Sequence, residues 1–226
     1  MPALRRLPVV LLAALALACG RGAEPATDPA ASAAAPVMDP RVARADLDRI
    51  RGDSAAPIWV MIVSDFQCPF CAQWEQETSA GFFKEFVETG KVRVAFVNFP
   101  LSQHQNARPA AEAAMCAGAQ GKFWAMHDRI FAQQATWSVL SMVGDYFDRP
   151  AAEVGVDMAA YKQCMGDHAM QALIDVDVDR ASKGGANSTP TFFIGDTEKL
   201  AGAADLPAMR EAIEKEMQRR ALSRAR

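Results

Sequence analysis

Two cysteines, Cys68 and Cys71, are separated by a proline and a phenylalanine in the stretch "SDFQCPFCAQW". Cysteines three positions apart on a helix lie one turn apart on the same face, so their sulfur atoms can reach bonding distance. If Cys68 caps the N-terminus of that helix, free backbone N–H groups and the helix dipole stabilise its thiolate. Pro69 suits the first helical position, where its missing N–H has no intrahelical partner. The pattern predicts a redox pair in which Cys68 is the exposed nucleophile and Cys71 the buried resolving thiol.

A stabilising disulfide and a zinc site are the two other uses of this spacing. A disulfide within the motif would close so small a ring that it would hardly constrain the unfolded chain. A zinc site needs another close pair, whereas Cys116 and Cys164 are 48 positions apart. His104 and His127 could add ligands, but they stand in helical or pre-helical contexts where packing is the usual role. We therefore expect redox chemistry at the motif and no metal.

The residues around the motif predict a strand, a helix and a second strand. Residues 57–66 are almost continuously apolar, which is typical of a central strand buried on both faces. After the motif, aromatic residues recur at near-helical spacing as far as Val87, and Gly90 supplies a stop. Residues 91–101 predict the second strand. This order forms a βαβ unit with a right-handed crossover.

A helical region follows, and the chain closes with a hairpin and a helix. Alanine-rich and amphipathic stretches predict several helices, including short ones over residues 140–147 and 158–165 and a longer one over 169–183. The run "TFFI", followed by a tight turn at Gly195, predicts a β-hairpin. Residues 206–220 predict an amphipathic final helix.

The chain resembles the DsbA-like branch of the thioredoxin superfamily in the order of its elements and in four stretches: "SDFQCPFC", "NFPLSQHQNARPAAEAAMCAGAQGKFWAMHDRIF", "YKQCM" and "NSTPTFFIG". The similarity extends from about Ala55 to the last helix. It implies an α/β fold, namely a thioredoxin fold with a helical domain inserted between the βαβ unit and the C-terminal β-hairpin and helix. The thioredoxin-like domain would then cover residues 41–222, with the insertion at about 106–183.

The resemblance also implies the second half of the redox site. In thioredoxin-like proteins a cis-proline loop faces the two cysteines, and the matching residues here are Thr189 and Pro190, directly before "TFFI". A cis bond is accessible at low cost only before proline. Such a loop lets a substrate peptide approach Cys68, and the backbone of Thr189 can pair with an extended substrate.

Two positions depart from the family pattern. Phe70 stands where DsbA-type oxidases often carry a histidine, so Cys68 should be less acidic than in the strongest oxidants. Ile62 stands where many thioredoxin-like proteins hold a buried acid that moves protons for the second cysteine. Asp65 lies closer to the motif and could take this proton role through water, or it could cap the helix or be solvated.

Cys116 and Cys164 match positions that carry cysteine in many relatives of this branch. The resemblance therefore implies a structural disulfide within the inserted helices. Cysteine parity agrees, since lipidation of Cys19 would leave four cysteines and hence two pairs in an oxidising compartment. Two buried free thiols are the alternative.

The N-terminus has the features of an export signal. Two arginines precede an apolar run over residues 7–17, which is too short to span a bilayer as a mature helix. We predict a signal peptide over residues 1–18 and Cys19 as the lipid acceptor of a bacterial lipoprotein, with simple secretory cleavage as the alternative. Residues 19–40, rich in alanine and proline, predict a disordered tether.

Composition and motifs together favour an extracytoplasmic enzyme. The net charge of -3 and the lack of a long basic run argue against a nucleic-acid partner. We expect a monomeric thiol:disulfide oxidoreductase that introduces or exchanges disulfides in exported proteins, with no cofactor beyond its redox disulfide. Its partners would be unfolded or cysteine-containing exported proteins, a membrane or soluble redox partner, and the membrane through the lipid anchor. A disulfide isomerase or reductase of the same fold is the alternative, and a tethered non-catalytic chaperone or metal-binding module is a weaker one.

Overall fold

The computed structural model describes residues 39–225. The predicted signal peptide lies outside the described residues, as do the predicted lipid acceptor Cys19 and the predicted tether except for its last two residues. Those two residues, Asp39 and Pro40, are the N-cap and the first residue of helix α1 (Pro40–Asp48). No helix in the described part of the chain is long and apolar enough to cross a membrane.

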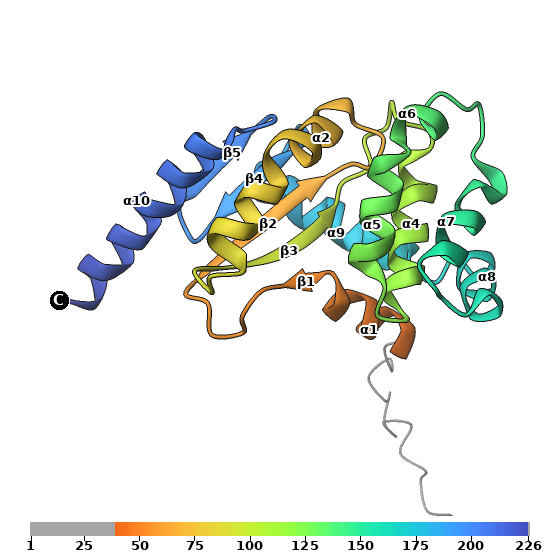
Figure 1. Ribbon diagram of the computed structural model, residues 1–226, viewed down its shortest axis with the longest axis horizontal. Helices are drawn as coiled ribbons and strands as arrows, with labels where there is room; N and C mark the ends of the chain where they lie inside the picture. Colours follow the sequence, from red (N-terminus) through yellow and green to blue (C-terminus); the bar gives the residue numbers. More distant parts are fainter. Residues whose placement is uncertain (1–38, 226) are drawn as a thin grey trace, which may run out of the picture. The chain divides into compact units, whose positions relative to one another are not determined.

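A five-stranded sheet organises the fold, with the strand order β1-β3-β2-β4-β5 (Figure 1). Strands β2 and β3 are parallel, whereas β4 runs antiparallel to β2 with Val63 opposite Thr191. This register brings the end of β2, which leads to Cys68, beside the start of β4, which follows Pro190. The strands are β1 (Ile50–Arg51), β2 (Ile58–Ser64), β3 (Val92–Asn98), β4 (Thr191–Ile194) and β5 (Glu198–Ala201).

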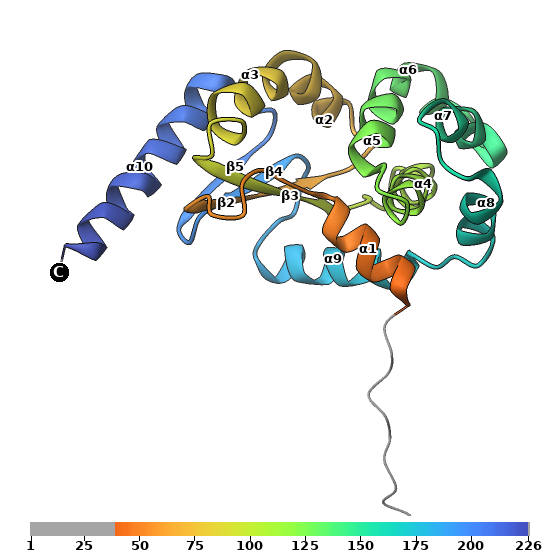
Figure 2. The ribbon, with the colours of Figure 1, turned by 60° about the horizontal axis from the view of Figure 1, so that its bottom comes forward.

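Helices lie on both faces of the sheet (Figure 2). The helical run that begins at Pro69 shares one face with the C-terminal helix, and α1 and α9 lie on the other. Trp74, Phe82 and Phe192 pack together in the core that lies between the sheet, the helical run from Pro69 and the C-terminal helix. The elements concerned are α2 (Pro69–Trp74), the π-helical η1 (Glu75–Ser79), α3 (Ala80–Phe82), the π-helical η2 (Phe83–Val87), α9 (Gln171–Lys183) and α10 (Leu206–Arg224).

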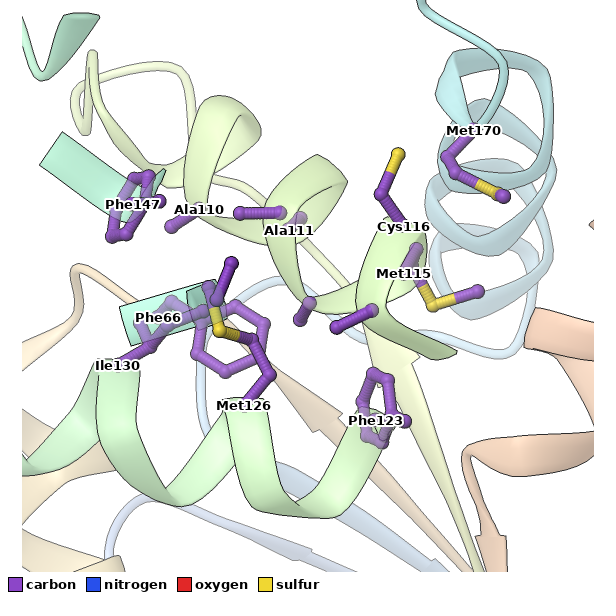
Figure 3. Packing of buried hydrophobic residues seen from close by; sticks show 14 of the residues in the cluster. Phe66, Ala110, Ala111, Met115, Cys116, Phe123, Met126, Ile130, Phe147 and Met170 are labelled. Carbon is purple, nitrogen blue, oxygen red and sulfur yellow. The ribbon is translucent and has the colours of Figure 1, made fainter. Parts of the chain in front are cut away.

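The predicted helical insertion lies between β3 and β4, and its helices pack around a second core that also includes Phe66, Phe96 and the two cysteines of the redox motif. Figure 3 shows Phe66, Ala110, Met126 and Ile130 within this core, which also contains the disulfide residue Cys116. Before α9 the insertion comprises α4 (Ala107–Gly118), α5 (Phe123–Ala132), α6 (Gln134–Trp137), the 3-10 helix η3 (Gly144–Phe147), α7 (Asp148–Glu153) and α8 (Met158–Gly166). The thioredoxin fold with an inserted helical domain is thus confirmed.

Phe66 links the loop before the redox motif to both the sheet and the insertion. Phe66, two positions before Cys68, is 1% exposed. Its ring centroid lies 5.0 Å from that of Phe96 on β3 and 4.9 Å from that of Phe131 on α5. Because the same side chain contacts the sheet and the insertion, the loop that carries Cys68 is fixed between the two parts.

Two sequence-based expectations about these elements were wrong. Strand β2 is not buried on both faces, since Trp59 and Met61 are each 37% exposed where α1 and α9 leave part of the sheet uncovered. No single helix covers residues 140–147. The segment turns instead, with the carbonyl of Leu140 accepting hydrogen bonds from the side chains of Gln105 and Asn106, and helix begins only at Gly144.

Candidate active site

Cys68 caps the N-terminus of α2. Its backbone is extended (φ −69°, ψ 124°), and Pro69 occupies the start of the helix. The N–H of Cys68 donates to the carbonyl of Asp65 at 3.1 Å, which forms the turn between β2 and the helix. The sulfur of Cys68 therefore lies beside backbone N–H groups of the first turn that have no intrahelical acceptor.

The two thiols differ sharply in acidity, and both are free in this structure. A hydrogen bond from the Cys71 thiol is the largest cause that lowers the pKa of Cys68, to about 6, and the N–H groups of Cys71 and Phe70 act in the same direction against burial. Burial raises the pKa of Cys71 well above its ordinary value. The pair thus comprises a thiolate-forming Cys68 and a Cys71 that keeps its proton.

The Thr189–Pro190 loop faces Cys68 from the other side of the site. The peptide bond between Thr189 and Pro190 is cis. The sulfur of Cys68 lies 3.4 Å from the carbonyl oxygen of Thr189, 121 positions along the chain. The fold therefore brings together the motif and the distant segment that the sequence pattern associates with it.

Cys68 is not the exposed residue that the motif predicted. Only 3% of its surface is accessible, because the Thr189 loop and the insertion pack around it. Access is through a cleft of about 520 Å³. The residues that line the cleft are Cys68, Pro69, Phe70, Leu101, Ser102, Gln103, His104, Asn187, Ser188 and Thr189.

Asp65 is buried beside the motif and is neither solvated nor a cap of α2. Its carboxylate accepts hydrogen bonds from the backbone N–H of Gln67 at 2.7 Å and of Leu101 at 2.9 Å. It also contacts Nδ1 of His104 at 2.7 Å. Burial raises the pKa of this carboxyl, and these hydrogen bonds oppose the rise. The N–H of Asp65 lies 3.5 Å from the Cys71 sulfur, so Asp65 adjoins both cysteines.

His104 and His127, the two histidines considered as metal ligands, have different surroundings. His127 is 1% exposed and packs its ring against those of Phe66, Phe96 and Phe131, as expected. Its ring nitrogens also contact the carboxylates of Glu75 at 3.4 Å and Asp128 at 2.9 Å. His104 was assigned the same role from the sequence, but it lines the cleft and contacts Asp65. No periodicity or spacing signal in the sequence connects His104 with the cysteine motif.

The insertion holds the motif through two glutamines that sequence reasoning missed. Gln134 on α6 donates to the carbonyls of Phe66 at 2.7 Å and Cys68 at 2.9 Å. Gln67 donates to the carbonyl of Ser138 at 2.8 Å and accepts from the N–H of Asn106 at 2.7 Å. These bonds position the N-cap residue from outside the thioredoxin fold.

Large apolar side chains are exposed in the redox motif and in the turn that is hydrogen-bonded to Gln67. Phe70, between the two cysteines, is 59% exposed. Gln67 donates a hydrogen bond to the carbonyl of Ser138 in the turn after α6. In the same turn, Val139 is 80% exposed and Met142 is 77% exposed. Large exposed apolar side chains near a reactive group are typical of surfaces that contact other polypeptides.

The second cysteine pair is a disulfide between Cys116 on α4 and Cys164 on α8, with the two Cα atoms 5.8 Å apart. Within residues 39–225, no group of three or more His, Cys, Asp or Glu side chains is arranged to hold a metal ion. The fold, the paired thiols and the facing cis-proline define a thioredoxin-like protein.

Comparisons with known proteins agree with this class. The family model described as thioredoxin matches residues 45–215. A probable disulfide bond formation protein D of Bacillus cereus is 27% identical over 177 residues, covering 74% of this chain and 78% of that protein. The crystal structure of Wolbachia pipientis alpha-DsbA1 superposes with a TM-score of 0.65 at 25% identity, covering 74% of this chain and 89% of that one.

A longer protein also contains a similar segment. The Na(+)/H(+) antiporter NhaA 1 of Salinispora arenicola is 31% identical over 169 residues, and the matched segment covers 74% of this chain but only 24% of the antiporter. The chain thus spans about a quarter of that relative's length. Because the family model covers most of the chain, the protein belongs to the thioredoxin family, in its DsbA-like branch.

Proposed function

We propose that the protein is an extracytoplasmic thiol:disulfide oxidoreductase that forms or exchanges disulfides in exported proteins. The observation that carries the proposal is the arrangement of three features: Cys68, whose pKa is lowered to about 6, and Thr189 line one cleft, and the thiol of the buried Cys71 donates a hydrogen bond to the Cys68 sulfur. A thiol of low pKa is a good leaving group, which favours transfer of a disulfide from the enzyme to a substrate.

In the proposed reaction the enzyme starts with Cys68 and Cys71 joined. A substrate thiolate attacks the Cys68 sulfur, the bond between the two enzyme sulfurs breaks, and Cys71 leaves with the electron pair and takes up a proton. A second substrate thiol then loses its proton and attacks the substrate sulfur of the mixed disulfide, and Cys68 leaves as a thiolate. The substrate has lost two electrons, which a partner oxidant later removes from the two cysteines.

The proposed substrate is an unfolded or cysteine-containing polypeptide that lies along the cleft. Support comes from the Thr189–Pro190 loop, whose backbone can pair with an extended chain. It also comes from the exposed apolar side chains of Phe70, which lines the cleft, and of Val139 and Met142 in the turn that is hydrogen-bonded to Gln67. We infer that Cys68, Pro69, Phe70, Cys71, Thr189 and Pro190 form the reactive and substrate-binding set.

The reduction potential of the Cys68–Cys71 couple tests the direction of the reaction. It can be measured by equilibrating the protein in glutathione buffers and counting alkylated thiols by mass spectrometry. An oxidase requires a potential well above that of thioredoxin, which is about −270 mV, and a value close to thioredoxin's would assign a reductase instead. Absence of any reversible couple would overturn the assignment of redox activity.

The proposed site of action is outside the cytoplasm, on a membrane to which a lipid on Cys19 anchors the protein. The apolar run before Cys19 and the composition of the following residues support this. Metabolic labelling with a lipid precursor should tag the wild-type protein, and the variant Cys19→Ser should lose the label and appear in the soluble extracytoplasmic fraction. An unlabelled, soluble wild-type protein would show simple secretion.

A further inference from the structure

We infer that His104, held in place by Asp65, is the base that takes the proton from a substrate thiol entering the cleft beside Cys68. This inference rests on the proposed function, because it assigns a residue to the attack step of thiol–disulfide exchange. His104 comes from the segment after β3, outside the cysteine motif and outside the Thr189–Pro190 loop. It would be a third chain segment that acts on the reacting atoms.

The hydrogen bonds of Asp65 fix the orientation of the imidazole. Two backbone N–H groups, of Gln67 and Leu101, already donate to the Asp65 carboxylate. The side chain of Asp65 is fully buried, and its Oδ2 lies 2.7 Å from Nδ1 of His104. An acceptor at this position keeps the proton of a neutral imidazole on Nδ1, so the lone pair that can accept a proton is on Nε2. A carboxylate that orients a histidine in this way recurs in enzymes where the histidine is a general base.

The ring lies in the cleft that gives access to Cys68. The His104 side chain is 19% exposed and lines the same cleft as Cys68 and Thr189. Its Nε2 has no hydrogen-bond contact with any residue in the range 39–225. Among titratable groups, Asp65 contacts the ring and Cys68 lines the same cleft, and the other side chains that line the cleft carry no charge. A base is therefore available in the cleft without a competing ion pair.

Such a base supplies what the attacking thiol lacks at neutral pH. A free cysteine has a pKa near 8.5, so only about 3% of a substrate thiol is ionised at pH 7. With His104 as base, the proton moves from the substrate sulfur to Nε2 while that sulfur bonds to Cys68 and the bond between Cys68 and Cys71 breaks. Cys71 leaves with the electron pair and takes up one proton, and the imidazolium gives its proton to water.

The test compares wild-type protein with His104→Asn. The amide N–H of asparagine can replace the Nδ1 donor to Asp65, but asparagine cannot accept the proton. A matched control is His168→Asn, because His168 also contacts a buried carboxylate, that of Glu112 at 3.1 Å, and does not line the cleft. Asparagine also tolerates the positive φ of 50° at that position.

The measurement is the rate constant with which the oxidised enzyme is reduced by a two-cysteine peptide, followed by acid quenching and mass spectrometry from pH 5.5 to 9.5. We expect His104→Asn to react about 10- to 30-fold more slowly than wild type at pH 7 and equally fast at pH 9.5, where the peptide is already a thiolate. His168→Asn should match wild type throughout.

Two results would overturn the inference while leaving the proposed function intact. One is a His104→Asn profile parallel to that of wild type. The other is a shift in the thiolate titration of Cys68 in the reduced variant that is large enough to account for the slower rate. If His104→Asn does not fold, His104→Gln gives the same comparison. A wild-type enzyme that does not react with the peptide at any pH would overturn the proposed function itself.

Discussion

The two cysteine pairs of this protein have almost the same exposure and opposite surroundings. Cys68 and Cys71 are 3% and 1% exposed, and Cys116 and Cys164 are 1% and 2% exposed. Accessibility therefore does not distinguish them. Cys68 lies at a helix N-terminus, where backbone N–H groups lack partners, whereas Cys116 lies in the last turn of α4, where the backbone N–H groups are engaged within the helix. The polar groups around a sulfur, and not its exposed area, therefore make it reactive.

The largest expected difference between the pairs is in activity. Cys68→Ser should lower the rate of substrate oxidation by at least about a thousandfold, because no other group can form the mixed disulfide. The double variant Cys116→Ala with Cys164→Ala should stay within about threefold of wild type. Oxidative refolding of a reduced test protein measures both. Comparable losses in the two variants would mean that the second pair also exchanges disulfides.

The next difference is in stability, and here the order of the pairs reverses. The Cys116–Cys164 disulfide closes a loop of 48 residues. In the chain-entropy model a loop of this length contributes about 4 kcal/mol, whereas the short ring of the motif contributes much less. Urea unfolding should therefore show a loss of about 4 kcal/mol for the double alanine variant. A loss below about 1 kcal/mol would indicate that the insertion is held by its apolar core alone.

A third difference should appear when the pH is changed. The pKa of Cys68 is lowered to about 6 in the folded, reduced protein, and it is near 8.5 in an unfolded chain. Its contribution to the free energy of unfolding is therefore fully present above pH 8.5 and is lost as the pH falls through 6. Relative to reduced Cys68→Ser, reduced wild type should gain about 2 to 3 kcal/mol between pH 5 and 8.5.

Thermal or urea unfolding of both reduced proteins at several pH values measures that gain. Thiolate absorbance supplies an independent check, with a midpoint near pH 6 in reduced wild type. The midpoint should rise in Cys71→Ala, because the Cys71 thiol donates the most important hydrogen bond to the Cys68 sulfur. A gain in stability with falling pH would contradict the assignment of Cys68 as the acidic thiol.

Local patterns allowed much of the fold and the redox motif to be predicted. The apolar run before Cys68, the helix after it and the run "TFFI" each correspond to an element at the expected place. The Cys68 N-cap also followed from the sequence, because proline at the next position restricts the backbone locally. These features depend on residues near one another in the chain.

The errors concern contacts between distant segments. The burial of Cys68 depends on Thr189, 121 positions away. The pairing of Asp65 with His104 depends on where the segment after β3 passes the motif, and no spacing rule describes that path. Trp59 and Met61 are apolar like their neighbours in β2, and their exposure is decided by the extent of α1 and α9.

The smallest expected effect concerns the link between the insertion and the redox pair. Gln134 is buried and donates to the carbonyls of Phe66 and Cys68, so Gln134→Leu leaves two buried acceptors without that donor. The expected loss in the free energy of unfolding is about 1 to 2 kcal/mol. Gln163→Leu is the matched control, because Gln163 is exposed on α8 and its side chain makes no hydrogen bond to the residues in the range 39–225.

If Gln134 positions the N-cap residue, its variant should also change the thiolate midpoint of Cys68, which the double alanine variant of the disulfide should leave unchanged. An unaltered midpoint in Gln134→Leu would mean that the thioredoxin fold alone sets the geometry of Cys68.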